Sequence, residues 1–139
     1  MKYLLDTNTC IYIIKRKPQD VLAKFQTIAP YDIGISSITV AELEYGAAKS
    51  QYPDRNRAAL AQFLMPLEIV HFDEQAAIIY GTIRATLERS GKIIGAMDLL
   101  IAAHALSLNL TLVTNNTKEF NRVQGLALEN WVTSYSNPK

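Results

Sequence analysis

The stretch that decides the fold is GAMDLLIAAHAL, residues 95–106. It is apolar on nearly every side of a helix, which predicts a helix buried in a core rather than an amphipathic surface helix. Asp98 then lies in the first turn, where the positive end of the helix dipole favours a carboxylate. His104 falls on the far side of this helix from Asp98, as a structural histidine. Helix stabilisation alone would explain Asp98, but two other apolar segments also present an acid at a comparable place.

The composition is typical of one ordinary domain. The chain has 139 residues, and its 49% hydrophobic content is ample for a single core. A net charge of +1 excludes a global basic field, so nucleic-acid contacts would come from local clusters. The single cysteine, Cys10, fits a reducing cytoplasm, and no run reaches the ~20 apolar residues of a membrane span. We expect a cytoplasmic protein with one domain over residues 1–132 and a polar tail over 133–139.

The apolar patterns predict strands that alternate with helices. Short apolar runs predict strands at 3–5, 33–36, 67–70 and 110–114, and a last apolar run covers 126–128. Helical spacing, caps and breakers predict helices from about 10 to the residue before Pro18, and at 19–27, 38–49, 53–64, 73–90 and 95–106. This alternation predicts an α/β fold with a mostly parallel sheet covered on both faces, in three α/β/α layers.

Acidic residues follow the predicted strand ends. Asp6 comes directly after the first strand, where open α/β sheets place their ligands, although Asp6, Thr7 or Asn8 would also cap the next helix. Glu42 and Glu44 lie about 200° apart on their helix, so only one of them can face the core edge, and Glu42 is closer to the helix start.

The acids are expected to gather at one edge of the sheet. The last strand ends in a second polar segment that contains Asn116 and Glu119, close to Asp6, Glu42 and Asp98. Three carboxylates so close together would raise one another's pKa unless a cation neutralised them. Mg²⁺ or Mn²⁺ takes such oxygen ligands and supports phosphodiester hydrolysis. A zinc-type histidine set, a G-x-S-x-G motif and a Walker loop are all absent from the sequence.

Four segments in order resemble the PIN domain and, more narrowly, the VapC ribonuclease toxins of bacterial VapBC toxin–antitoxin modules. They are Asp6-Thr7-Asn8, Val40-Ala41-Glu42-Leu43, residues 97–105 around Asp98, and residues 112–120 around Asn116. Each segment is weak alone, but their order in a chain of this size is highly specific, and the similarity runs from Tyr3 to about Trp131.

The resemblance implies a magnesium-dependent endoribonuclease that leaves a 5′-phosphate, with tRNA cleaved in the anticodon stem-loop as the expected reaction. By position, Asp6, Glu42 and Asp98 match the family's catalytic acids, and Asp6 and Asp98 match its direct metal ligands. Thr7 and Asn8 match residues that orient the first acid. Many family members have Asp where this chain has Asn116, which removes one charge that Glu119 could replace.

The resemblance also implies partners. VapC-like proteins form homodimers and are inhibited by a VapB antitoxin whose tail covers the acidic pocket. Candidate phosphate contacts are basic residues in four local clusters, any of which could equally be a solvated face: Lys15, Arg16 and Lys17; Arg55 and Arg57; Arg84, Arg89 and Lys92; and Lys118 and Arg122.

Two other hypotheses about the function remain open. A non-catalytic PIN-like module that binds RNA or protein would have no need for clustered acids. A phosphoaspartyl enzyme with Asp6 as nucleophile would be expected to carry a D-x-D pair and a lysine after a late strand.

Overall fold

A five-stranded sheet with the order β3-β2-β1-β4-β5 forms the centre of the computed structural model, which describes residues 1–133. Every neighbouring pair is parallel. The strands are β1 (Tyr3–Leu5), β2 (Ile33–Ser36), β3 (Glu68–Val70), β4 (Thr111–Val113) and β5 (Leu128–Glu129). The strand order changes direction between β1 and β4, which is the place where such sheets bind ligands at their carboxyl ends.

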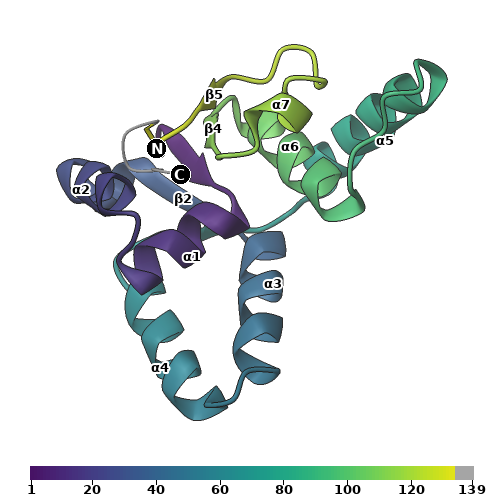
Figure 1. The fold of residues 1–139 in the computed structure, drawn as a ribbon. Helices are drawn as coiled ribbons and strands as arrows, with labels where there is room; N and C mark the ends of the chain where they lie inside the picture. The colour runs from purple at the N-terminus through teal and green to yellow at the C-terminus, as the bar shows by residue number, and fades with distance from the viewer. Residues whose placement is uncertain (134–139) are drawn as a thin grey trace.

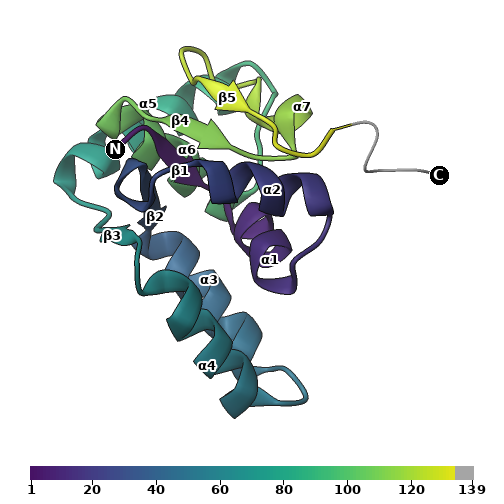
Figure 2. The same ribbon diagram turned by 90° about the vertical axis from the view of Figure 1, so that its left-hand side faces the viewer.

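Helices cover both faces of the sheet (Figures 1 and 2). The α-helices are α1 (Thr7–Lys15), α2 (Gln19–Thr27), α3 (Ser37–Ala48), α4 (Pro53–Leu64), α5 (Glu74–Arg89), α6 (Ala96–Leu108) and α7 (Thr117–Phe120), and a 3₁₀ turn, η1 (Pro30–Asp32), precedes β2.

The alternation of β1 side chains separates two cores. Leu5 packs into a cluster with residues of α1, α2, α3 and α4, whereas Leu4 packs into a cluster with residues of α5, α6 and α7. Successive strand residues point to opposite faces, so one short buried strand contributes to both layers. The predicted three-layer α/β/α arrangement is therefore confirmed.

Helices α3 and α4 pack side by side and extend away from the sheet as a hairpin (Figures 1 and 2). Ser36, at the end of β2, caps α3 by accepting a hydrogen bond from the Ile38 backbone N–H at 3.0 Å. Pro53 opens α4 from the first helical position, where its missing N–H has no cost. The hairpin therefore begins at the carboxyl edge of the sheet.

Most of the predicted elements are confirmed to within one or two residues. Residues 117–120, expected only as a polar strand exit, form the short helix α7, and the apolar run near residue 128 ends in the two-residue strand β5. Of the predicted tail, residues 134–139 lie outside the described residues. No helix within residues 1–133 is both long enough and apolar enough to cross a membrane.

Candidate active site

Asp6 is the most buried of the predicted acids, with 5% of its surface exposed. It caps α1, because its Oδ1 accepts a hydrogen bond from the Thr9 backbone N–H at 2.8 Å. Burial raises the pKa of Asp6, hydrogen bonds from Thr114 and Thr9 lower it, and the charge of Glu42 raises it further. The carboxylate is thus held in one orientation at the junction of β1 and β4.

Thr9 and Thr114 were not among the predicted site residues, although both are buried and both hydrogen-bond to Asp6. Thr9 also donates to the Val113 carbonyl at 3.3 Å. The available signal was a hydroxyl directly after a buried strand, since Thr114 follows β4 as Asp6 follows β1.

Glu42 lies on the second turn of α3 and is partly buried, while Glu44 is exposed and lies 3.9 Å from Arg57. The predicted difference between these two glutamates is therefore confirmed. The Thr7 hydroxyl donates a hydrogen bond to the Glu42 carboxylate. This bond connects the start of α1 to α3 and fixes Glu42 beside the segment that carries Asp6.

Asp98 lies in the first turn of α6 and interacts electrostatically with the three other acids. Burial, a hydrogen bond to Glu119, and the negative charges of Glu119, Asp6 and Glu42 together raise the pKa of Asp98 to about 7. The hydrogen bond favours the protonated form of Asp98, which donates to Glu119. The fold therefore brings Asp6, Glu42 and Glu119 within electrostatic reach of Asp98.

Asn116 belongs to the same edge through Glu119, because its Nδ2 donates to Glu119 Oε1 at 3.2 Å. Asn8 is placed differently. It is exposed on the first turn of α1, and within residues 1–133 its side chain makes no hydrogen bond to any of the acids. The expectation that Thr7 and Asn8 orient Asp6 therefore differs from the structure: Thr7 bonds to Glu42, and within residues 1–133 Asp6 is held by Thr9 and Thr114 instead.

The acids fit a hard divalent cation by their chemistry. Within residues 1–133, no three Asp, Glu, His or Cys side chains are close enough to hold a metal ion by themselves. Magnesium is commonly held by only one or two carboxylates, with water and substrate phosphate as its other ligands. A cation between Asp6 and Asp98 would also offset the repulsion that raises the pKa of Asp98.

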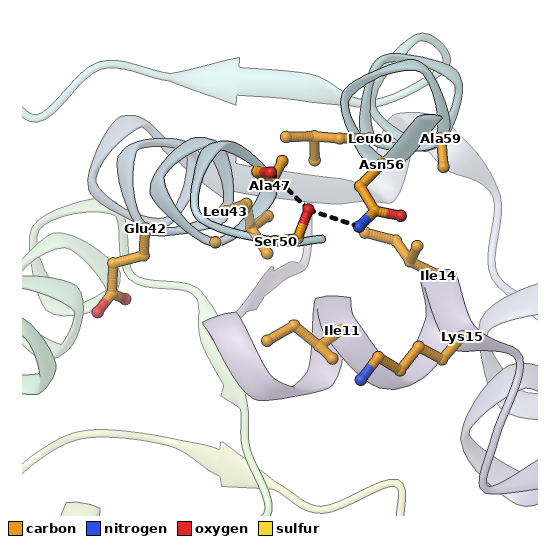
Figure 3. Close-up of a pocket in the computed structure, with 11 residues that line it drawn as sticks. Ile11, Ile14, Lys15, Glu42, Leu43, Ala47, Ser50, Asn56, Ala59 and Leu60 are labelled. Atoms are coloured by element: carbon orange, nitrogen blue, oxygen red, sulfur yellow. Dashed lines mark hydrogen bonds between the residues drawn. The ribbon is translucent and has the colours of Figure 1, made fainter. Parts of the chain in front are cut away.

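A largely apolar groove of about 290 Å³ runs between α1, α3 and α4 beside this site. Figure 3 shows Glu42 at one end, with Leu43, Ile11, Ile14 and Leu60 further along. Lys15 also lines the groove. The groove therefore runs from the hairpin to the acidic edge.

Several of the predicted basic residues make structural contacts. Arg57 lies within 4 Å of Glu44 and Asp54, Arg84 bonds to Glu88 and Tyr80, and Arg122 donates to the Ile93 carbonyl at 3.0 Å. Arg16 has a left-handed backbone at the end of α1. Among residues 1–133, the side chains without an ion pair to an acid include Lys15, Lys49, Arg55, Lys92 and Lys118.

Comparison with protein families gives a match to the PIN domain over residues 3–126. The chain is 51% identical to ribonuclease VapC2 of Haemophilus influenzae, covering 95% of this chain and 99% of that protein. It is 47% identical to the tRNA(fMet)-specific endonuclease VapC of Salmonella typhimurium, with 94% and 98% covered.

Solved structures of VapBC complexes are similar in fold to this chain. DNA-bound VapBC from Salmonella typhimurium matches with a TM-score of 0.90 at 47% identity, covering 95% of this chain and 99% of that one. VapBC2 from Rickettsia felis, bound to a promoter DNA fragment, matches with a TM-score of 0.89 at 46% identity, covering 95% and 100%.

Proposed function

The chain belongs to the PIN-domain family and, within it, to the VapC ribonucleases, and we propose that it is the toxin of a VapBC module, a metal-dependent endoribonuclease that cleaves tRNA and so inhibits translation in the cytoplasm. The observation that carries this proposal is the electrostatic coupling of Asp98 to Asp6, Glu42 and Glu119 at the carboxyl edge of the sheet. A non-catalytic module would gain nothing from this repulsion.

The residues around the acids have defined roles in this proposal. Asp6 is held by Thr9 and Thr114, and Glu42 is held by Thr7, so two of the three acids are oriented before RNA binds. Asp98 lies at the positive end of α6, which favours its ionised form once a cation is present. Such preorganisation avoids reorienting these groups during the reaction.

Mg²⁺, with Mn²⁺ as a substitute, is the proposed ion, and Asp6 and Asp98 would hold it. When bound, it would activate water and stabilise the leaving oxygen of the phosphodiester. Glu42 and Glu119 are proposed to hold water or substrate groups close to Asp98, with Asn116 oriented by Glu119.

We base the proposed substrate on a relative's name, and the proposed inhibitor on the composition of similar solved complexes. One relative is named for cleaving tRNA(fMet), so we take initiator tRNA as the first candidate substrate. The similar solved structures are VapBC complexes, and a VapB-type antitoxin is therefore the proposed inhibitory partner. We also expect a homodimer, which light scattering of the purified protein would test.

The deciding experiment incubates antitoxin-free protein with initiator tRNA, in Mg²⁺ or in EDTA, and maps the ends of the products. We expect discrete Mg²⁺-dependent fragments with 5′-phosphates. Asp98→Asn and Glu42→Gln should abolish them. Asp54→Asn, in the first turn of α4, and Glu44→Gln, on the exposed side of α3, are matched controls that should cleave normally.

Failure of the folded, metal-supplied protein to cut any tRNA would contradict the proposal and favour a binding module. Equal cleavage by Asp98→Asn and the wild type would place the chemistry elsewhere.

A further inference from the structure

The hairpin of α3 and α4 carries two exposed tyrosines, each paired with a cation. Lys49 Nζ lies 4.9 Å from the centroid of the Tyr45 ring, and the Arg55 guanidinium lies 4.8 Å from that of Tyr52. Tyr45 is 65% exposed and Tyr52 is 52% exposed. We call these four residues the hairpin surface.

The positions of Tyr45 and Lys49 relative to Glu42 show that the hairpin surface extends outward from the acidic site. Residues at i, i+3 and i+7 lie on one face of a helix, so Glu42 and Tyr45 share a face of α3, and Lys49, the residue that caps the C-terminal end of α3, continues that line. Seven residues cover about 10 Å of helix. The line therefore runs outward along the hairpin from Glu42, which also lines the groove of Figure 3.

The charges on the hairpin surface favour an anionic partner. Among residues 1–133, neither Lys49 nor Arg55 makes an ion pair with an acid, and the neighbouring Arg57 pairs with Glu44 and Asp54. Each free cation instead lies on an aromatic ring, in a pairing that stays exposed to solvent. Exposed aromatic rings with cations beside them match unpaired bases and their phosphates.

We propose that the hairpin surface binds the single-stranded nucleotides next to the scissile phosphate, with Tyr45 stacking on a base and Lys49 contacting a phosphate. This inference rests on the proposed ribonuclease function and adds to it how the substrate is aligned. Tyr52, which precedes α4, and Arg55, in the first turn of α4, place a second ring and cation at the tip of the hairpin. Stacking requires unpaired bases, so the surface selects loops over duplexes.

A protein partner fits these features less well. The apolar side of the hairpin is the groove lined by Leu43, Ala47 and Leu60, whereas Tyr45 and Lys49 do not line it. An apolar segment of an antitoxin would be expected in that groove. The four residues of the hairpin surface all lie outside it.

The test measures RNA binding in the Asp98→Asn background, where RNA is not cut. The probes are a labelled hairpin RNA with the anticodon stem-loop sequence of initiator tRNA and a fully paired duplex of the same length. We expect Tyr45→Leu to weaken hairpin binding about tenfold, with duplex binding unchanged, because one stacked base is lost. Tyr45→Phe keeps the ring and should retain binding.

Two matched controls lie at the opposite edge of the sheet. Tyr31, which is 77% exposed in the turn before β2, is changed to Leu, and Lys2, just before β1, is changed to Gln. Neither should alter binding. Lys49→Gln should reduce the slope of log affinity against log salt by about 0.7, as expected for one contact to a single strand. In the active protein, Tyr45→Leu should raise KM and leave kcat nearly unchanged.

The inference is overturned if Tyr45→Leu binds the hairpin RNA as tightly as Tyr31→Leu does. It is also overturned if Tyr45→Leu binds RNA normally but escapes inhibition by the antitoxin, which would assign the surface to that protein. Failure of the wild type to cleave tRNA would instead contradict the proposed function, and the binding comparison would still report on the surface.

Discussion

Nδ1 of His104 lies 2.8 Å from Oγ of Ser36, and both residues are buried. Ser36 Oγ also accepts the hydrogen bond that caps α3. Because His104 is on the helix that carries Asp98 and Ser36 begins the helix that carries Glu42, this pair fixes the two helices relative to each other. His104, which was expected to be a structural histidine, thus helps to position the helices that carry Asp98 and Glu42.

The burial of His104 predicts a loss of stability in mild acid. Burial lowers the pKa of His104 below 6.5, its ordinary value. Below about pH 6.5 the unfolded chain therefore binds more protons than the folded chain, so the free energy of unfolding falls as the pH drops. We expect His104→Ala to cost about 2–3 kcal/mol at pH 8 and to remove this part of the acid dependence.

Urea unfolding of both proteins between pH 5 and 8 would measure the effect of His104, with His71→Ala, an exposed histidine, as the control. An acid dependence that persists unchanged in His104→Ala would contradict the assignment.

Asp98→Asn should stabilise the metal-free protein while it abolishes cleavage. With its pKa raised from 3.8 to about 7, Asp98 binds a proton in the folded chain across a range where the unfolded chain has released it. Stability is thus lost as the pH rises through that range. Removing the charge should raise the free energy of unfolding at pH 8 by about 1–2 kcal/mol, allowing for partial exposure. Thermal unfolding in chelator at pH 8 would show this, and a lower melting temperature for Asp98→Asn would contradict it.

Thr7→Val should reduce activity more than stability. Valine keeps the shape of threonine but cannot donate the hydrogen bond to Glu42. We expect about a tenfold loss in kcat and a change of less than about 1 kcal/mol in unfolding free energy. Thr7→Ser keeps the hydroxyl and should restore kcat. Equal rates for the Val and Ser variants would show that this hydrogen bond is not needed.

Asn116→Asp should tighten Mg²⁺ binding. The substitution replaces a donor to Glu119 with another negative charge near Asp98. We expect half-maximal cleavage at a several-fold lower Mg²⁺ concentration, and a small loss of stability in EDTA from like-charge repulsion. Asn115→Asp, on the adjacent exposed residue, is the control and should not shift the Mg²⁺ dependence. An unchanged Mg²⁺ titration for Asn116→Asp would place this residue outside the metal site.

The sequence predicted the elements well because their signals are local. An almost continuous apolar segment predicted α6, while Pro18 marked the end of α1 and Pro53 the start of α4. The short elements α7 and β5 were missed, because a single turn of helix or a pair of residues has no periodicity to read. β5 is defined by its pairing with Leu112 and Val113 on β4.

By itself, the sequence determined the α/β class, the family and the acids Asp6, Glu42 and Asp98 as candidates, since these depend on residue type and order along the chain. Only the tertiary structure decided how the acids are held. The contacts of Thr7 with Glu42 and of Thr114 with Asp6 join residues far apart in sequence, and the coupling of Asp98 to Glu119 joins two different helices. Such contacts depend on which strands lie side by side, because hydrogen bonds and charge interactions act over a few ångströms of space rather than along the chain.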